Sequence, residues 1–284
     1  MLVTVYLPTR NRLALLQRAV ASVLAQTHQT LELIVVDDGS TDATSEWLGH
    51  LGVLDLRVRL LRNLHSQGAP AARNKAILSA HGEWVTGLDD DDQFTPERLA
   101  TFLKHAARLD AAGARYCGLY STERIESAHR TYTLDKKRVV SFESLFHYNH
   151  IGNQIFARRS TYLDAGLFDE SMPAWQDLDL FLRMVHRCGP AHLVPHSTYV
   201  LSDDERADRI SRQQKARLLD AHARIAAKWA QVSATDKQRL YLQLLAPFYD
   251  LPIEWADLRR YFGHGVSPLA VARLARVVAR RRWT

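Results

Sequence analysis

Short apolar runs alternate with segments of helical periodicity along the first half of the chain. The apolar runs have the length of buried strands, and the segments between them repeat apolar residues every three or four positions. This alternation is typical of right-handed βαβ units wound around a parallel sheet, so it predicts an α/β fold. Strands are expected at residues 2–7, 31–36, 58–61, 83–88 and 116–122, and helices after residues 11 and 41, at 69–79 and from 96 to about 112.

Residues that favour helix N-termini stand in front of several of these helices. Asn11 is expected to cap the first helix, and Ser40 or Thr41 the second. Ser267 followed by Pro268 is expected to open the last helix, because proline suits the first helical position. These residues predict where the helices begin.

The second half of the chain contains shorter elements. Residues 123–141 are mixed and polar, which favours a hairpin or a loop, and strands are expected at 154–157 and 193–201. A helix is predicted from Leu178, because every third or fourth residue after it is apolar. From residue 212 onward helical periodicity dominates, which predicts a C-terminal helical appendage rather than a second catalytic core.

The composition is that of a globular protein. The chain has 284 residues, 46% of them apolar, which is enough for one large domain or one domain with an appendage. No stretch approaches the ~20 apolar residues of a membrane span, and the start of the chain lacks the basic region of a signal peptide. Cys117 and Cys188 are too few and too far apart for a disulfide framework or a zinc site, so a reducing cytoplasm is expected.

The positive charge is concentrated at the C-terminus. The net charge is +6, and residues 269–284 contain five arginines and no acid, so they account for +5 of it. The near-neutral remainder argues against a nucleic-acid-binding surface. The last helix is basic and amphipathic and has Trp283 near its end, so it predicts either peripheral contact with an anionic membrane or an ordinary solvated helix.

Four consecutive carboxylates, Asp89 to Asp92, follow the fourth predicted strand. An isolated acidic run is most often a solvated loop, but an ordered one requires a counter-charge, and a divalent cation is the natural candidate. Residues 9–11 and 37–39 follow two other predicted strands. Because ligands of parallel sheets bind beyond the carboxyl ends of the strands, these three polar loops predict one shared site.

The same three segments resemble a known family. Residues 3–11 (VTVYLPTRN), 33–42 (LIVVDDGSTD) and 82–92 (GEWVTGLDDDD) are similar, in order and spacing, to successive motifs of the family 2 glycosyltransferases. The resemblance covers about residues 1–211. It implies a GT-A type, Rossmann-like nucleotide-binding fold with a mostly parallel central sheet. Its nucleotide-sugar-binding half would be 1–122 and its acceptor-binding half 123–211, followed by the helical region 212–284.

The resemblance also implies an activity. The family moves a sugar from a nucleotide diphosphate donor to an acceptor hydroxyl and inverts the anomeric carbon. The expected donor base is uracil, and the expected cofactor is Mn²⁺ or Mg²⁺. The expected acceptor is a bacterial surface glycan or glycolipid such as lipopolysaccharide or capsule, reached from the cytoplasmic face of the membrane.

The donor-binding residues follow from the family motifs. Asp38 is expected to hydrogen-bond the base, and Arg73 to contact the diphosphate, although an ordinary solvated helix residue would satisfy the same pattern. Asp91 is the expected direct metal ligand, and Asp92 a structural residue. The remaining expected donor contacts are Pro8, Thr9 and Arg10 near the base, Asp89 and Asp90 on the ribose or a metal-bound water, and Arg209 on the diphosphate, where some relatives use a histidine.

Asp177 stands where the family has its catalytic base. A carboxylate can take the proton of an acceptor hydroxyl, although an acid at a helix start also stabilises the helix dipole without any catalytic role. The acid that precedes the base in the family is Gln176 here. The residues expected on the acceptor side are Gly152, Asn153, Trp175 and Gln176.

Two other functions remain open at this point. Because Gln176 replaces an acid, the chain is alternatively a non-catalytic nucleotide-sugar-binding or scaffold protein on the same fold. A Mg²⁺-dependent nucleotidyltransferase or phosphohydrolase could use the acidic run, but it would leave Asp177 without a role.

Overall fold

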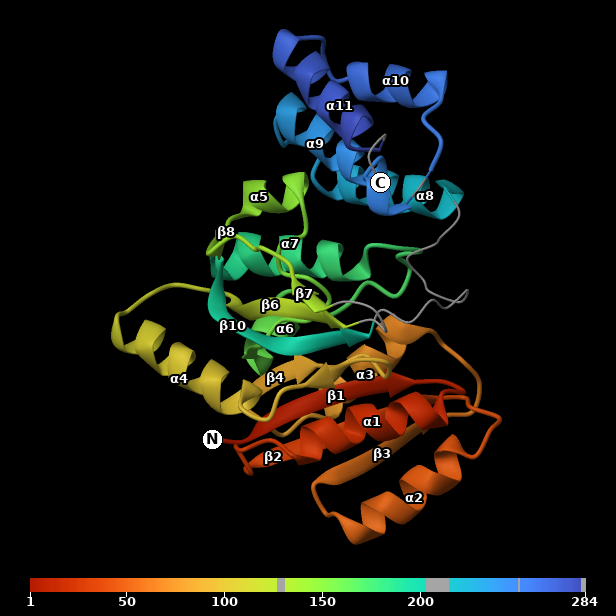
Figure 1. The fold of residues 1–284 in the computed structure, drawn as a ribbon, viewed down its shortest axis with the longest axis vertical. Helices are drawn as coiled ribbons and strands as arrows, with labels where there is room; N and C mark the ends of the chain where they lie inside the picture. Colours follow the sequence, from red (N-terminus) through yellow and green to blue (C-terminus); the bar gives the residue numbers. More distant parts are fainter. Residues whose placement is uncertain (127–130, 203–214, 250, 282–284) are drawn as a thin grey trace.

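The computed structural model describes residues 1–126, 131–202, 215–249 and 251–281. The N-terminal part, red to orange in Figure 1, forms a sheet with helices packed on it, and the central part forms a second sheet beside it. Helices of the C-terminal part lie at the opposite end of the molecule from α2 (Figure 1). The expected α/β fold with C-terminal helices is therefore confirmed.

The first sheet has the strand order β3-β2-β1-β4-β9. Its first four strands pair in parallel, as the alternation of strands and helices predicts, and β9 is antiparallel to β4. Of the strand expected at 154–157, only the last residue enters β9. The observed strand is therefore shorter than expected and begins later in the chain. The strands are β1 Val3–Thr9, β2 Leu31–Asp38, β3 Val58–Asn63, β4 Trp84–Gly87 and β9 Ala157–Arg158.

Alternate residues of the central strands face two different cores. On β1, Val5 and Leu7 belong to one core and Tyr6 to the other. The first core is completed by α1 Leu13–Leu24, α2 Thr44–Leu54 and α4 Arg98–Ala111, and the second by α3 Ala69–Ser79 and by later parts of the chain. Both faces of the sheet are thus covered, which explains why its strands are continuously apolar in sequence.

A second, mixed sheet has the order β5-β10-β6-β7, with β8 paired to β10. β6 and β10 run parallel, although they are far apart in sequence, and β6 and β7 pair antiparallel. The predicted hairpin within 123–141 is therefore confirmed. The elements of this part are β5 Gln93–Phe94, β6 Gly118–Glu126, β7 Thr131–Thr133, β8 Val139–Val140, α5 Phe142–His147, α6 Arg159–Asp164, α7 Gln176–Cys188 and β10 Ala191–Ser202.

The C-terminal helices share a hydrophobic core with the second half of the fold. Buried residues of α8 and α9 belong to the same cluster as those of α5 and α7. The elements are α8 Lys215–Lys228, α9 Ala234–Leu244, the 3₁₀ turn η2 Pro247–Tyr249, α10 Trp255–Phe262 and α11 Pro268–Arg281. The boundary at 211/212 stays a prediction, but the helices are not an independently packed unit.

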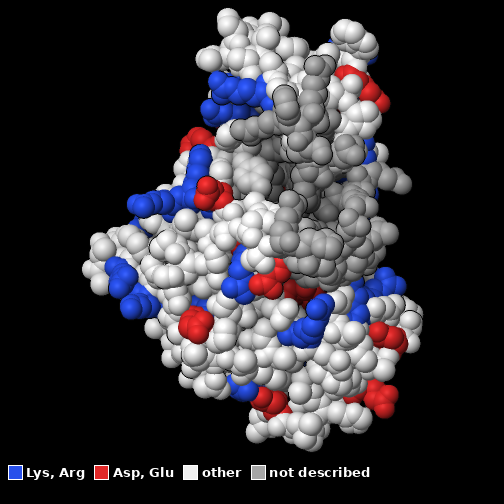
Figure 2. Space-filling model, in the orientation of Figure 1, with Lys and Arg blue, Asp and Glu red and all other residues white. Residues whose placement is uncertain are grey.

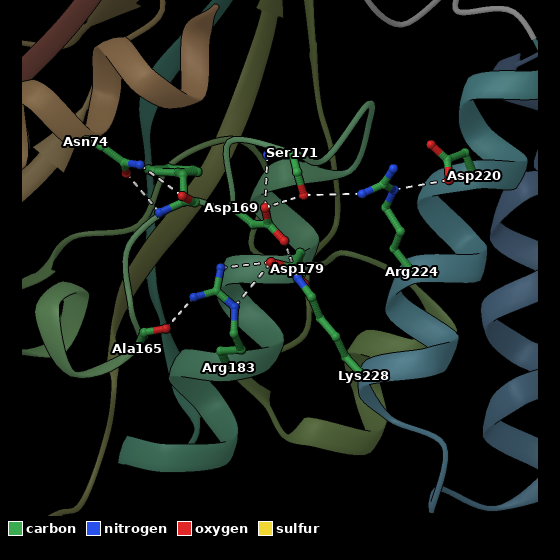
Figure 3. A network of polar contacts seen from close by, with 10 residues as sticks. Asn74, Ala165, Asp169, Ser171, Asp179, Arg183, Asp220, Arg224 and Lys228 are labelled. Atoms are coloured by element: carbon green, nitrogen blue, oxygen red, sulfur yellow. Dashed lines mark hydrogen bonds and ion pairs between the residues drawn. The ribbon is translucent and has the colours of Figure 1, made fainter.

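A polar network joins α8 to α7 (Figure 3). Asp179 is fully buried and pairs with Arg183 and with Lys228 of α8, each at 2.8 Å. Lys228 also reaches Asp169 at 2.6 Å. Because an unpaired buried charge is strongly destabilising, this network fixes the C-terminal helices against α7.

Two of the expected helix caps are wrong. α1 begins at Leu13 without a side-chain cap, and Asn11 adopts a left-handed conformation with φ 53°. Its side-chain oxygen accepts the N–H of Thr41 at 2.7 Å, while its own N–H donates to Ser40 Oγ at 2.9 Å. Asn11 and Ser40 instead join the loops after β1 and β2. The start of α11 at Pro268 is confirmed.

Among the described residues, none of the helices has both the length and the apolar character needed to cross a membrane.

Gly87 lies where a side chain would not fit. A Cβ at this position would come within 2.0 Å of Gln154 Oε1 and 2.3 Å of the Tyr6 ring. We expect Gly87→Ala to lower the free energy of unfolding by about 1–3 kcal/mol. The matched control is Gly49→Ala, because Gly49 lies in α2 with nothing within 4 Å of the added Cβ. It should raise stability by about 0.5–1 kcal/mol. Urea unfolding of both variants measures the difference, and equal stabilities would contradict the packing around Gly87.

Candidate active site

The acidic run lies at the carboxyl end of β4, and its first member is held by both halves of the fold. Asp89 Oδ1 accepts hydrogen bonds from Arg73 and from Gln154, each at 3.0 Å. Asn153 approaches Oδ2 at 3.4 Å. Arg73 belongs to α3, within residues 1–122, and the two amides lie within residues 123–211, so Asp89 joins these two parts of the chain.

Asp90 is turned into the protein. It is 6% exposed, and its carboxylate accepts a hydrogen bond from Thr9 at 2.8 Å and pairs with Arg12 at 3.2 Å. Burial raises its pKa to about 6, against the effect of Thr9 and Arg12. In this position it supports the loop after β1. Contact with a ribose, the role expected for it, stays a prediction.

Asp92 and Asp91 point to different surroundings. Asp92 is 4% exposed and accepts a hydrogen bond from Tyr199 at 2.9 Å, in line with the structural role expected for it. The side chain of Asp91 is 23% exposed and lies 3.6 Å from Arg12. Together with Asp89, whose side chain is 20% exposed, Asp91 therefore has one of the two more exposed carboxylates of the run.

These residues fit a divalent cation that shares its coordination with a substrate. In the part of the chain that the structure describes, no three metal-ligating side chains are gathered into a preformed cage. Mg²⁺ is usually held by one or two carboxylates together with substrate phosphates and water. Asp91, with Asp89 two residues before it, matches that type of site.

Asp38 is saturated by the loop that follows β3. Its carboxylate accepts hydrogen bonds from the Asn63 amide at 2.8 Å, the Ser66 hydroxyl at 2.6 Å and the N–H groups of Gln67 and Gly68 at 2.9 Å. Four donors fill the acceptor capacity of a carboxylate. A nucleotide base could bind Asp38 only by displacing one of them, so the expected role of Asp38 requires this loop to move.

Arg73 connects the acidic run to the predicted base. Besides its bond to Asp89, its guanidinium lies 3.4 Å from Gln176 Oε1 and 5.4 Å from the centre of the Phe168 ring. Burial alone would lower the pKa of Arg73, but the charge of Asp89 beside it leaves that pKa raised. This cation is thus permanent and faces the space next to Asp177.

Asp177 lies in the first turn of α7, as predicted, and is partly buried. Its Oδ2 accepts a hydrogen bond from Asn149 Nδ2 at 2.9 Å. Burial raises the pKa of Asp177 to about 6, while the start of the helix and Arg73 act in the opposite direction. A carboxyl with this pKa is ionised at neutral pH and still basic enough to accept a proton.

The remaining expected residues are placed as follows. Gly152 has φ 96° and donates its N–H to Asn149, Trp175 is the residue before α7, and Arg10 is exposed just after β1. Pro8 is paired with Val36 in the sheet. Arg209 lies outside the described residues, so its expected contact with the diphosphate stays a prediction.

Four residues of the site were missed by sequence reasoning. They are Tyr6, whose hydroxyl donates to Gln154 at 2.8 Å, Gln154 itself, Arg12, which faces Asp90, and Asn149, which holds Asp177. Gln154 and Asn149 come from a segment with no family motif. Only their three-dimensional neighbours identify them.

Comparisons with known proteins identify the family. The sequence profile of "Glycosyl transferase family 2" matches residues 4–164, which is more than half of the chain. The chain belongs to glycosyl transferase family 2. Its fold and its three motifs are therefore those of a family 2 glycosyltransferase enzyme.

Relatives of this family 2 enzyme agree with that assignment. WcaA of Escherichia coli (strain K12), named for colanic acid biosynthesis, is 37% identical over 201 residues, 70% of this chain and 72% of WcaA. The fold is similar to that of S. aureus TarS 1–349 in complex with UDP-GlcNAc, with a TM-score of 0.68, 17% identity and coverage of 93% and 79% of the two chains. It is also similar to PcManGT from Pyrobaculum calidifontis in complex with GDP-Man and Mn²⁺, with a TM-score of 0.62, 19% identity and coverage of 98% and 79%.

The surface of this family 2 enzyme carries mixed charge on the face shown in Figure 2, where basic and acidic side chains are interspersed.

Substitutions of Asp89 and Asp91 should have different effects on stability and on metal binding. We expect Asp89→Asn to destabilise the enzyme by about 1–3 kcal/mol, because it removes the charge that faces the largely buried Arg73. Asp91→Asn, at a more exposed position, should change stability by less than about 0.5 kcal/mol. The Asp91 variant should instead lose the increase in melting temperature that Mn²⁺ and UDP together produce in the unmodified enzyme. If Asp91→Asn kept that increase, Asp91 would not be the metal ligand.

Proposed function

We propose that this family 2 enzyme is an inverting, metal-dependent transferase. It moves a sugar from a nucleotide diphosphate donor, with uracil as the expected base, to a hydroxyl of a bacterial surface glycan or glycolipid. The acceptor class is supported by the identity with WcaA, which is named for colanic acid biosynthesis. The donor class is supported by the TarS and PcManGT structures of the same fold, which contain UDP-GlcNAc and GDP-Man.

The observation that carries this proposal is the position of Asp177 near a permanent cation. Its carboxylate is held by Asn149, and Gln176, the residue before it, is linked through Arg73 to Asp89. This arrangement supports a general base and a group suited to a diphosphate in one site. This is the combination that transfer to a hydroxyl requires.

The chemistry assigns one role to each group. Asp177 takes the proton from the acceptor hydroxyl while the acceptor oxygen bonds to the anomeric carbon. The bond from that carbon to the diphosphate oxygen breaks on the opposite side, so the configuration inverts and the nucleoside diphosphate leaves with the electron pair. Arg73 offers charge-assisted hydrogen bonds to the departing diphosphate. A Mn²⁺ or Mg²⁺ ion held by Asp91 would offset the negative charge that develops there.

A non-catalytic, nucleotide-sugar-binding role is the second candidate, because Gln176 replaces the acid that usually precedes the base. Here its amide oxygen lies 3.4 Å from Arg73, where a carboxylate would form an ion pair. The replacement removes one negative charge beside Asp177 but leaves the base itself in place. Turnover distinguishes the two candidates.

The first test is a panel of UDP- and GDP-sugars, with and without Mn²⁺. A donor at ~100 times its dissociation constant should stabilise the enzyme by ~2.7 kcal/mol, measured as an increase in melting temperature. Release of the nucleoside diphosphate should follow when an acceptor is present. Binding without any release would favour the scaffold, and the absence of binding to every nucleotide sugar would remove the basis of the proposal.

Replacing the base should abolish most of the activity. We expect Asp177→Asn to lower kcat by ~10²–10⁴ with little change in donor affinity. Since the base must be ionised, kcat/KM of the unmodified enzyme should rise with pH and level off above the Asp177 pKa of about 6. An Asp177→Asn enzyme with normal turnover would refute the assigned mechanism.

We also propose that α11 brings the enzyme to the cytoplasmic face of an anionic membrane. The apolar face of α11 is not free for lipid, because Ala270 and Leu274 are buried in the protein core. The large apolar residues exposed on α11 are Leu269, 67% exposed, and Val271, 50% exposed. Together with the arginines of the tail, they would give weak, salt-sensitive binding.

Co-sedimentation with vesicles tests this contact. Binding to vesicles with phosphatidylglycerol should exceed binding to phosphatidylcholine vesicles, and it should fall at high salt. Leu269→Asp combined with Arg276→Glu should weaken it several-fold, at about 1 kcal/mol per basic residue. The matched control is Leu56→Asp, because Leu56 is 92% exposed and lies next to β3 in the other half of the fold. Equal loss with the control would exclude α11 as the contact.

A further inference from the structure

The loop after α5 is built around the side chain of Asn149. Its Oδ1 accepts the N–H groups of Ile151 at 3.2 Å and Gly152 at 3.3 Å, and its Nδ2 donates to the carbonyl of Gly152 at 3.0 Å. Gly152 has φ 96°, and a Cβ there would come within 2.0 Å of Glu123 Oε1. This closed loop leaves the second N–H of the amide to point at Asp177.

A C-terminal helix forms hydrogen bonds with the end of α5, just before this loop. Gln243 of α9 donates from Nε2 to the carbonyls of Leu145 at 2.7 Å and Phe146 at 2.9 Å, at the end of α5. Asn149 follows three residues later. The position of its amide is therefore determined by residues outside the motifs of the family.

The C-terminal region also holds the start of α7. Trp175 has φ 55°, a left-handed conformation that costs a non-glycine residue energy and persists only where its surroundings impose it. Its Nε1 donates to the hydroxyl of Tyr249, in η2, at 2.7 Å. Asp177 lies two residues further on, so the C-terminal region orients both partners of the Asn149–Asp177 bond.

We propose that Asn149 is a positioning residue for the catalytic carboxylate. Its amide donates to Oδ2 of Asp177, which keeps the carboxylate in one orientation, and it favours the ionised form because only that form gains a charge-assisted hydrogen bond. The inference rests on the proposed role of Asp177 as the base. If so, the C-terminal region helps to orient the catalytic carboxylate through the contacts of Gln243 and Tyr249.

Other titratable groups lie around Asp177 and set the baseline for a test. They are Arg73 of α3, Asp89 after β4, Tyr6 of β1 and Tyr249 of η2. None of these groups is altered by a change at Asn149, so a change in the titration of Asp177 reports on the amide itself.

Two substitutions separate the structural role of Asn149 from its action on the base. Asn149→Asp keeps an oxygen for the N–H groups of Ile151 and Gly152, but it replaces the donor that faces Asp177 with a negative charge. Asn149→Ala removes both functions. If Asn149 only closes its loop, the aspartate variant will be less impaired than the alanine variant, because it keeps two of the three loop bonds and loses only the one donated to the Gly152 carbonyl. If it positions the base, the aspartate variant will be affected at least as strongly.

The direct measurement is a carboxyl ¹³C titration of the full chain labelled with [¹³C]aspartate, without any ligand. The signal of Asp177 is assigned by its loss in Asp177→Asn. We expect the proton affinity of Asp177 to rise about tenfold in Asn149→Ala, which means a higher pKa. The rise should be larger in Asn149→Asp, because a like charge disfavours ionisation further. Asn153→Asp, which adds the same charge four residues away and opposite Asp89, is the control and should change the pKa much less.

The kinetic measurement uses release of UDP or GDP from the donor that the panel identifies. In Asn149→Asp the acidic limb of kcat/KM should move to higher pH together with the pKa of Asp177. The rate at about pH 5 should then fall by the same factor, about tenfold or more, by which the proton affinity of Asp177 rises. The donor KM should stay unchanged.

The outcomes separate this inference from the proposed function. An unaltered Asp177 titration in both variants would overturn the inference even if activity were lost. Normal turnover by Asp177→Asn would instead refute the proposed function and leave the titration result intact.

Discussion

Four adjacent carboxylates can be ordered in one loop because they do not share one environment. Like charges at this spacing raise the pKa values of their neighbours, and burial adds to the effect, as the raised pKa of Asp90 illustrates. The structure separates them. Asp89 faces Arg73 and two amides, Asp90 faces Thr9 and Arg12, Asp92 accepts a hydrogen bond from the hydroxyl of Tyr199, and the side chain of Asp91 is 23% exposed and lies 3.6 Å from Arg12. Most of the run is thus held by the protein itself, and Asp91 is the member that we propose as the metal ligand.

The two halves of the fold meet through these side chains rather than through backbone pairing alone. Arg73 and Asp89 come from residues 1–122, while Gln154 and Gln176 come from residues 123–211. Because Arg73 is largely buried, its charge remains strong and is shared between the site of the leaving group and the vicinity of the base. With the neutral Gln176 beside Arg73, Asp89 is the carboxylate that forms an ion pair with the guanidinium.

The C-terminal helices are part of the machinery that holds the base. Lys228 pairs with the buried Asp179, two residues after Asp177, and Tyr249 binds the indole of Trp175, two residues before it. A helix that is fixed on both sides of Asp177 has little freedom to reorient that carboxylate, which we propose as the base. This gives a physical reason why the helical region packs into the same core as the acceptor-binding half.

The amino-acid sequence by itself determined the α/β class, the parallel order of the first strands, the family and the location of Asp91 and Asp177. Each of these depends on local periodicity or on motifs that are contiguous in the chain. Local pattern could not reveal that β6 and β10 pair in a second sheet, that Asn11 and Ser40 join two loops instead of capping helices, or that four donors saturate Asp38. Nor could it identify Asn149, Gln154 or Tyr249. Their roles come from hydrogen bonds between segments far apart in sequence, and only the tertiary structure decides which of those segments meet.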